Sequence, residues 1–472
     1  MQERRTRRPG DRMVRLPRIR PWRVIVREMP QQRAVAFSPL LLVYGFVGLI
    51  AVGTVLLVLP VSSRTGDPTP FVDALFTATS AVCVTGLVVV DTADYWSGFG
   101  QGVVLVLIQL GGFGFMTSAT LFLLALGRRI GLRERMLIGQ SMGLSRLGGL
   151  IRIVREMAIF TVVVEVAGVI LFSIRFWGEA SPGAAIWRSV FHSISAFNNA
   201  GFDLSGGFRS LADYQSDPTV LLLTALFIVL GGISYLVVID VLRTRRLARL
   251  SLDTKLVLVT TATLLVLGTA IMLVTEFADP DTLGPLSVPQ KLLNAFFQSV
   301  TARTAGFSAV NMANLADYAL FFTMLLMFVG GASGSTAGGI KVNTFGLLGA
   351  TVWSMMRGSE HPGAFGRNFA GNQVYRGLAV VVLALGFLSI VVLLLTVTEE
   401  SRFLDIVFES VSAFGTVGLS TGVTPYLSVA GRVIITVTMF VGRLGPLALG
   451  LSLIERQRPA RYGHPTESVR IG

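Results

Sequence analysis

One short pattern recurs four times along the chain and restricts its fold more than any other feature. Each copy begins with a Phe, continues through a few small or hydroxylated residues, and reaches a Gly ten positions later. The copies are Phe76–Gly86, Phe191–Gly201, Phe296–Gly306 and Phe408–Gly418, and the glycines are 115, 105 and 112 residues apart. Four equivalent glycine loops can surround one axis, where their backbone carbonyls can replace the hydration shell of a cation.

Composition predicts a polytopic membrane protein. The chain is 52% hydrophobic and only 14% charged, whereas soluble domains carry about 25% charged residues. Four apolar runs are long enough to cross a hydrocarbon core of about 30 Å, at 37–59, 102–126, 257–274 and 378–397. The Arg-rich start lacks a short apolar h-region, so a cleavable signal peptide is not expected.

The charge distribution predicts the orientation in the membrane. The net charge is +13, and basic clusters at 4–33, 128–155, 243–255, 357–376 and 456–470 alternate with acidic loops. This alternation is the positive-inside pattern and predicts that both termini are cytoplasmic. It argues against nucleic acid as the partner of the positive charge. The acidic loops either concentrate cations at the pore mouth or are ordinary solvated loops.

Each copy of the pattern lies in a longer repeat of one apolar helix, one short half-apolar segment and a second apolar helix. The predicted fold is therefore an all-α polytopic membrane protein with four linked helix–pore loop–helix repeats. Its eight spans and four re-entrant pore helices surround one central pore, because non-helical backbone at membrane depth needs a polar interior. The expected outer helices are 37–59, 157–177, 255–275 and 376–398; the short segments are 71–83, 186–198, 290–302 and 403–415; the inner helices are 100–126, 218–242, 317–350 and 428–453.

The repeats divide the chain into eight parts. A cytoplasmic Arg-rich arm covers 1–36 and a cytoplasmic tail covers 456–472. Repeats 1 to 4 cover 37–127, 157–246, 247–354 and 376–455, with cytoplasmic linkers at 128–156 and 355–375. The arm carries eleven Arg and three acidic residues within 1–33, so it either binds anionic lipid or a cytosolic partner, or simply enforces topology.

The inner helices carry a second repeated feature. Gly111-Gly112, Gly231-Gly232, Gly330-Gly331 and Gly442-Arg443 follow the pattern glycines by 24 to 30 residues. The third inner helix is further interrupted by the sequence Gly-Gly-Ala-Ser-Gly-Ser-Thr-Ala-Gly-Gly over 330–339. At about 1 kcal/mol per Gly, a regular helix is strongly disfavoured there. The third repeat also aligns better from Phe297, with a one-residue deletion.

Several motifs together resemble the Trk/Ktr/HKT cation-transporter superfamily, and most closely KtrB-type membrane subunits of bacterial Ktr potassium-uptake systems. The resemblance covers most of 37–455 and keeps the order of all motifs. Those motifs are Val82–Leu87, Ser195–Phe202, Thr301–Phe307, Gly334–Lys341 and Phe440–Pro446.

The resemblance implies a function and a set of partners. It implies a potassium-uptake pore subunit that conducts K⁺ into the cytoplasm, often stimulated by Na⁺, in the bacterial inner (plasma) membrane. It also implies a homodimer on a cytosolic KtrA-like ring of nucleotide-binding subunits. Regulation is expected to come from such a separate subunit, since no nucleotide-binding domain is recognised in this sequence. K⁺ is the expected ion, and Na⁺ is a second candidate. In plant relatives a Ser in place of the first filter Gly accompanies Na⁺ preference, so Gly86 favours K⁺.

The resemblance also assigns a filter and a gate. The expected filter, which would bind K⁺, comprises Val84, Thr85, Gly86, Asn199, Ala200, Gly201, Thr304, Ala305, Gly306, Thr416, Val417 and Gly418. The expected gate is the interruption of the third inner helix with one Arg of the fourth: Gly330, Gly331, Gly334, Ser335, Thr336, Gly338, Gly339, Lys341 and Arg443.

Charged residues in apolar surroundings are further candidates, since an embedded charge needs protein or water around it. Arg443 either faces the pore as a barrier or gate partner, or pairs with loop carbonyls. Lys341 either serves the gate or extends to the cytoplasmic surface. Arg303 is expected to brace the filter, and Glu409 either braces it or attracts cations.

Two further acidic residues lie in or near the helices. Glu165, within an apolar helix, is expected to pair with an Arg or a helix break, with a Na⁺ or proton site as the alternative. Asp240 is expected at the membrane interface.

Other classes of protein fit the sequence less well. An ion-coupled carrier of organic solutes normally uses inverted repeats, whereas these four repeats run parallel. An intramembrane enzyme needs clustered His, Asp or Glu, and no H-E-x-x-H motif is present, so no enzyme activity is expected. Cys83 is the single cysteine and the three histidines are scattered. A Na⁺-permeable or non-selective cation channel of the same fold remains the main alternative.

Overall fold

The computed structural model describes residues 40–114, 150–179, 181–359 and 361–455. The predicted arm 1–36, the tail 456–472, most of the linker 128–156 and the end of the first expected inner helix lie outside these residues. The described chain is mostly helical.

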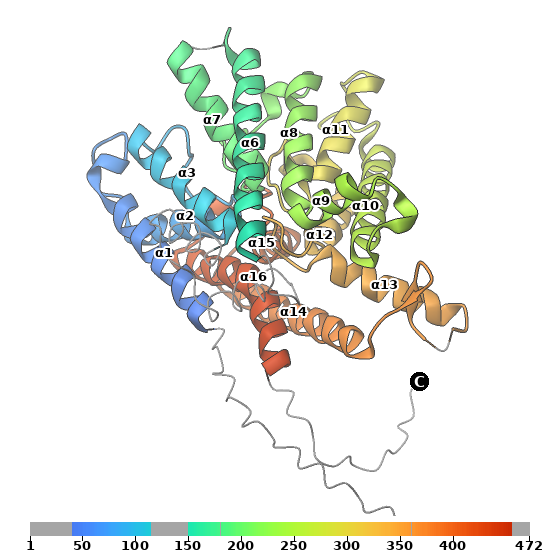
Figure 1. Cartoon of the computed structure of the whole chain (residues 1–472). Coiled ribbons are helices and arrows are strands. Elements are labelled where there is room, and N and C mark those ends of the chain that lie inside the picture. The colour runs from blue at the N-terminus through green and yellow to red at the C-terminus, as the bar shows by residue number, and fades with distance from the viewer. Residues whose placement is uncertain (1–39, 115–149, 180, 360, 456–472) are drawn as a thin grey trace, which may run out of the picture. The chain divides into compact units, whose positions relative to one another are not determined.

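The helices fall into four consecutive groups, and in each group a short helix of 13 to 17 residues follows a longer one (Figure 1). The first is α1 (Leu40–Val58), α2 (Phe71–Cys83) and α3 (Gly98–Phe113). The second is α6 (Leu150–Phe176), α7 (Pro182–Asn198), α8 (Pro218–Gly232) and α9 (Tyr235–Thr244). The third is α10 (Leu252–Glu276), α11 (Val288–Thr301), α12 (Asp317–Phe328) and α13 (Val342–Met356). The fourth is α14 (Gly371–Thr398), α15 (Phe403–Gly415) and α16 (Val429–Glu455).

Short polar residues start several of these helices. The Ser97 hydroxyl accepts a hydrogen bond from the Gly100 N–H, and the Asp217 carboxylate accepts from the N–H groups of Thr219 and Val220. Ser287 forms a capping box with Gln290. Such side chains satisfy N–H groups that have no partner within the helix, so each start is fixed by local sequence.

The four groups close into a ring. The helix α3 packs against α7, α8 against α11, α12 against α15, and α16 against α2. Figure 1 shows the groups following one another in chain order, from blue through green and yellow to red. The short helices α2, α7, α11 and α15 therefore all lie toward the inside of one ring.

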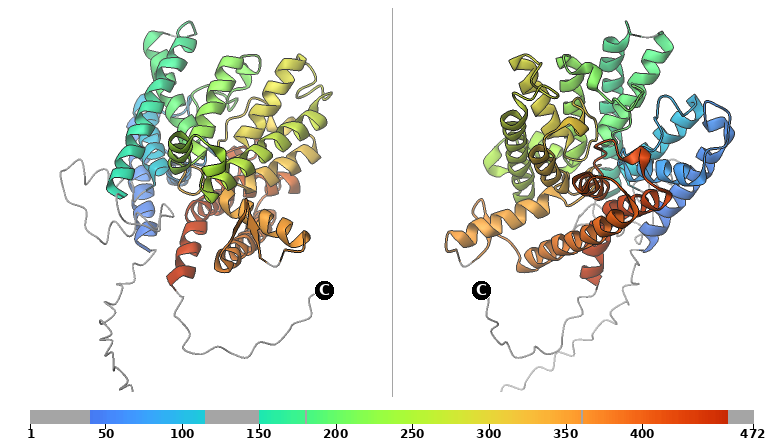
Figure 2. Two further views of the ribbon diagram at one scale, coloured as in Figure 1. Left: turned by 45° about the vertical axis from the view of Figure 1, so that its right-hand side comes forward. Right: turned by 180° about the vertical axis from the view of Figure 1, so that it is seen from behind.

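Three helices are long and apolar enough to cross a membrane, within the residues that the structure describes: α6, α10 and α14. At most 28% of their apolar windows is buried inside the protein. Apolar side chains such as Val266 and Val397 point outward from them. An apolar surface of this kind needs an apolar solvent, which a bilayer supplies. The long helix α14 runs beside α16 (Figure 2).

Two inner segments depart from a continuous helix. The predicted inner helix 218–242 is wrong as a single rod, because α8 ends at Gly232 and α9 continues at 94° to it. Between α12 and α13 the chain leaves the helix from Val329 to Lys341. The region 355–375, expected as a linker, contains a small antiparallel hairpin of β1 (Gly363–Ala364) and β2 (Arg367–Asn368).

Candidate functional site

The four pattern glycines meet in a closed cycle at the centre of the helix ring. A Cβ on Gly201 would lie 2.8 Å from the Ala305 carbonyl oxygen, and one on Gly306 would lie 2.5 Å from that of Val417. Equivalent Cβ atoms on Gly86 and Gly418 would collide with the carbonyl oxygens of Ala200 and Thr85. Each glycine thus lies against the carbonyl that precedes the next one. We call Gly86, Gly201, Gly306 and Gly418 the glycine ring.

The glycines of this ring are required for two independent reasons. Their φ angles are +90°, +70°, +79° and +95° in chain order, in a region that residues with a Cβ rarely adopt. Their neighbours across the ring are backbone atoms, which cannot rotate away as a side chain can. Any larger residue is therefore both strained and in collision.

A left-handed residue precedes each ring glycine by two positions. These residues are Val84, Asn199, Thr304 and Thr416, with φ between +50° and +69°. In three groups this residue directly caps the short helix, at the C-termini of α2, α7 and α15. Because the last carbonyls of a helix carry partial negative charge, the short helices direct negative potential at the ring.

A hydroxyl side chain anchors each ring loop, which sequence analysis did not anticipate. The hydroxyls of Ser80 and Ser412 accept hydrogen bonds from the N–H groups of Gly86 and Gly418, both at 3.1 Å. The hydroxyls of Ser195 and Thr301 donate to the carbonyls of Phe202 and Phe307, both at 2.6 Å.

The anchors also reveal how the third repeat differs. The anchor lies six positions before the ring glycine in three groups, but Thr301 lies five positions before Gly306. This is the one-residue deletion expected from the Phe297 alignment, and α11 accordingly ends in an αR cap at Ala302 rather than a left-handed one. The shared offset was a signal in the sequence that could have identified the anchors.

The residues beside the ring glycines are fully enclosed. Thr85, Ala200, Ala305 and Val417 have no exposed surface. Among the described residues, the hydroxyl oxygens of Thr85, Thr304 and Thr416 have no hydrogen-bond partner. Buried polar atoms normally have partners, so unpaired oxygens at the ring fit a place where a cation can be coordinated.

The segment that interrupts the third inner helix lies directly against the ring loops. We call residues 329–341 the interrupting loop. Its two ends are joined, because the Gly330 N–H donates to the Ile340 carbonyl at 2.8 Å and the Val342 N–H to that of Gly331 at 3.0 Å. Gly338 packs so closely on the Thr416 side chain that a Cβ has no room. All the predicted gate residues except Arg443 lie in this loop.

The bend between α8 and α9 provides acceptors for the interrupting loop. The N–H of Ala332 donates to the Gly232 carbonyl at 2.9 Å, and the N–H of Thr336 to the Gly231 carbonyl at 3.3 Å. The Thr336 hydroxyl also donates to the Gly231 carbonyl at 3.0 Å. Carbonyls at the end of α8 lack intrahelical partners, so the two breaks in neighbouring groups satisfy each other.

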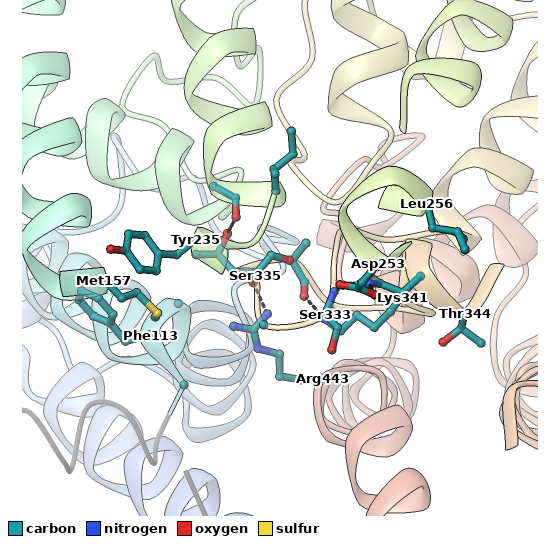
Figure 3. A pocket seen from close by; sticks show the side chains of 18 of the residues that line it. Phe113, Met157, Tyr235, Asp253, Leu256, Ser333, Ser335, Lys341, Thr344 and Arg443 are labelled. Carbon is teal, nitrogen blue, oxygen red and sulfur yellow. Dashed lines mark hydrogen bonds between the residues drawn. The ribbon is translucent and has the colours of Figure 1, made fainter. Parts of the chain in front are cut away.

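Arg443 of α16 joins the interrupting loop to the first group. Its guanidinium donates to the Thr336 carbonyl and, at 2.7 Å, to the Gly111 carbonyl at the end of α3. Figure 3 shows Arg443 pointing at the loop. Its partners among the described residues are thus backbone carbonyls, and the guanidinium lies between three groups rather than in lipid.

Two more cations contact the same loop. Arg303, just before the left-handed Thr304, donates to the Gly330 carbonyl at 3.1 Å, and its Nε has no partner among the described residues. Lys341 donates to the Ala337 carbonyl at 2.5 Å. Lys341 therefore closes the loop on itself instead of extending to the surface, and Arg303 links the third ring loop to the base of the interrupting loop.

A cavity of about 630 Å³ lies beside the interrupting loop. Its wall includes Ser333 to Ala337, Lys341 and Arg443, and on the opposite side Phe113, Met157 and Tyr235. Figure 3 shows these side chains around one space. The cavity is large enough to hold several water molecules.

The structure places the three carboxylates that were singled out from the sequence, Glu165, Asp240 and Glu409. Glu409, 1% exposed, accepts hydrogen bonds from Ser420, Thr421 and Thr424, so it braces the loop that follows the fourth ring glycine. Asp240 accepts from Thr244, Ser251 and Thr254 and ties α9 to α10. Among the described residues, Glu165 accepts hydrogen bonds from the side-chain amides of Gln109 and Asn198 and not from the Arg or the helix break that the sequence led us to expect.

Comparison with known proteins identifies the family. The TrkH family profile, described as a cation transport protein, matches residues 31–457. The chain belongs to the TrkH family of cation transport proteins. It is 42% identical over 434 residues to the Ktr system potassium uptake protein B of Bacillus subtilis, covering 92% of this chain and 96% of that protein. It is 38% identical to the potassium/sodium uptake protein NtpJ of Enterococcus hirae, covering 92% and 96%.

A solved TrkH structure has the same fold. The potassium transporter TrkH from Vibrio parahaemolyticus matches with a TM-score of 0.67 at 18% identity, over 91% of this chain and 86% of that one. The resemblance to the Trk/Ktr superfamily that the motifs indicated is thereby confirmed. As a TrkH-family member the chain is a membrane cation transporter and not an enzyme.

Proposed function

We propose that this protein is the potassium-uptake pore subunit of a bacterial Ktr-type system, and that K⁺ crosses the plasma membrane through the glycine ring. The observation that carries the proposal is the closed cycle in which each ring glycine lies against the preceding carbonyl of the next loop. Relatives described as potassium uptake proteins at 37–42% identity support the choice of ion.

The ring loops have the chemistry of a filter. Carbonyls of Thr85, Ala200, Ala305 and Val417 supply neutral oxygens that can replace water around a weakly hydrated cation. The C-termini of the short helices add negative potential that favours cations over anions. The proposed filter therefore consists of the residues named from the sequence, which are the ring glycines and the two residues before each of them.

The interrupting loop has the position of a gate. It contacts the second and fourth ring loops at Asn199 and Thr416, and Arg443 holds it to α3. Passage of an ion along the ring axis then requires this loop to move, which breaks a small number of hydrogen bonds. A loop rich in glycine can adopt more than one conformation at low cost.

The assembly proposed around the pore follows the family resemblance. The protein acts as a homodimer on a cytosolic KtrA-like ring that senses a nucleotide, and Na⁺ stimulates transport. The name of NtpJ includes both potassium and sodium, which supports a role for Na⁺. Both termini are cytoplasmic in this proposal, and anionic lipid is a partner of the basic arm.

The test is cation flux into liposomes that contain the purified protein alone, with K⁺ or Na⁺ as the sole permeant cation. Fast K⁺ flux with little Na⁺ flux is the expected result. Equal flux of both ions would favour a Na⁺-permeable or non-selective channel of the same fold. Absence of flux both alone and with the cytosolic ring added would contradict the proposal.

A further inference from the structure

Glu165 is a buried carboxylate in an apolar helix, and its side-chain partners among the described residues are neutral amides. It lies in α6 and is 7% exposed. Oε2 accepts from Gln109 Nε2 at 3.2 Å and Oε1 from Asn198 Nδ2 at 3.1 Å. Within the ranges that the structure describes, neither oxygen is within ion-pair distance of a Lys, Arg or His. Two neutral amides do not compensate a full charge at membrane depth.

The three side chains converge from three helices and two groups. Gln109 is near the end of α3, Glu165 is in the middle of α6, and Asn198 is the last residue of α7. The Asn198 amide also donates to Gln109 Oε1 at 2.9 Å, so all three are mutually in contact. Together they offer a carboxylate and two amide oxygens, the donor types that hard cations prefer. A rotation of each amide exchanges its nitrogen for its oxygen.

The cavity beside the interrupting loop extends toward this cluster. Thr161, one helical turn before Glu165, lines the cavity beside the interrupting loop, and so does Gly112 at the end of α3. Phe113 and Met157 of the same two helices are visible on this wall in Figure 3. A small hydrated ion that enters the cavity therefore comes within one turn of the carboxylate.

We propose that Glu165, Gln109 and Asn198 form a binding site for Na⁺, and that its occupancy regulates the interrupting loop. The regulatory half of this inference rests on the proposed K⁺ conduction. Gln109 lies two residues before Gly111, whose carbonyl shares the Arg443 guanidinium with Thr336. An ion that draws Gln109 toward Glu165 also repositions the end of α3, and thereby the Gly111 carbonyl that binds the same guanidinium as the loop.

Binding is tested without transport, by the melting temperature of the purified protein in NaCl and in choline chloride at equal ionic strength and constant K⁺. Wild type is expected to melt at a higher temperature in NaCl, since a ligand that binds the folded state stabilises it. Glu165→Gln, which keeps the shape and removes the charge, is expected to abolish this difference. Glu156→Gln on the same helix removes a surface carboxylate paired with Arg152 and should keep it.

Regulation is tested by K⁺ flux as Na⁺ is varied. In Glu165→Gln the Na⁺ concentration for half-maximal stimulation is expected to rise at least about tenfold, as loss of a ligand weakens an ion site. Glu165→Asp keeps the charge on a shorter side chain and should give an intermediate value. This variant keeps the test decisive if Glu165→Gln does not fold.

The site would be overturned if NaCl did not raise the melting temperature of wild type above its value in choline chloride, or if NaCl raised that of Glu165→Gln by the same amount. It would also be overturned if low pH alone stabilised wild type and this effect disappeared in Glu165→Gln. The last result would mean that the carboxyl carries a proton. K⁺ flux of wild type in choline chloride tests conduction separately. A protein that binds Na⁺ but conducts no K⁺, with or without the ring, would contradict the proposed function and leave the site intact.

Discussion

The guanidinium of Arg443 donates a hydrogen bond to the carbonyl of Thr336, although the two residues are 107 positions apart in the chain. The same guanidinium holds the Gly111 carbonyl of α3. A loop that lacks regular secondary structure is thus fixed to two helices from other groups. In the proposed gate, the closed position of this loop therefore depends in part on one side chain, Arg443.

Replacing Arg443 should release the interrupting loop. A hydrogen bond from a charged donor contributes about 1.5–3 kcal/mol, so Arg443→Gln should favour the open loop roughly tenfold to a hundredfold. The measurement is K⁺ flux into liposomes without the cytosolic ring. Arg432→Gln, on the same helix but paired with Asp73, is the control. A folded Arg443→Gln protein with unchanged flux would show that this arginine only braces the helix.

Shortening the interrupting loop should raise K⁺ flux, as the replacement of Arg443 should. Deletion of 334–337 removes Thr336 together with its contacts to Gly231 and Arg443. Loss of several bonds that exist only in the closed position should raise K⁺ flux by at least about tenfold. The readout is initial uptake in liposomes, with reconstitution checked by protein content. Wild-type flux in the deletion variant would identify the loop as a spacer.

Gly86→Ser should weaken discrimination between K⁺ and Na⁺. The new Cβ meets the Ala200 carbonyl across the ring, and φ of +90° disfavours any side chain. Gly66→Ser is a matched control, because Gly66 has φ of +78° but open space around it. Relative Na⁺ and K⁺ flux should change in the first variant and remain at the wild-type ratio in the second. The same ratio in both variants would argue against the ring as the filter.

Removing one hydroxyl anchor should loosen one ring loop. Thr301→Val deletes the bond to the Phe307 carbonyl at nearly constant volume, which should destabilise the protein by about 1 kcal/mol. Thr301→Ser retains the hydroxyl and is the control. Melting temperature in K⁺ and ion selectivity are measured together. If valine and serine behave alike, the hydroxyl does not anchor the loop.

Alkaline pH should destabilise the segment between α7 and α8 that contains Tyr214. Burial, and next the hydrogen bond to Glu179, raise the pKa of Tyr214 from 10.0 to about 12. A phenol with a higher pKa in the folded state contributes stability fully below its unfolded pKa, and this contribution is lost as the pH rises through the folded one. The melting temperature of wild type should therefore fall between pH 10 and about 12. In Tyr214→Phe the melting temperature should fall less steeply with pH over this interval.

The sequence predicted the parts of the site that depend on local chemistry. The short helices begin and end within about four residues of their expected bounds, because a repeated glycine follows each of them by three to five residues. The interruption after Phe328 follows from its glycine content in the same way. The ring glycines were found because their spacing repeats.

The parts that the sequence did not predict depend on contacts between groups. The local sequence does not indicate that the carbonyls of Gly231 and Gly232, at the end of α8, accept hydrogen bonds from a loop about 100 residues later. A Gly-Gly pair followed by Ser234, a good N-cap, was the available signal for the new helix α9. The sequence also did not reveal the amide partners of Glu165, because Gln109 and Asn198 lie on helices other than α6.

The one-residue deletion at Thr301 shows what a single continuous chain permits. In an assembly of four identical subunits every change appears on all four sides of the axis at once. Here the third group carries a shortened turn and the interrupting loop, whereas α16 of the fourth group continues without a break. In the proposed pore, one group can therefore obstruct the ion path while the glycines of all four groups discriminate between ions, and selection can tune these two properties as separate traits.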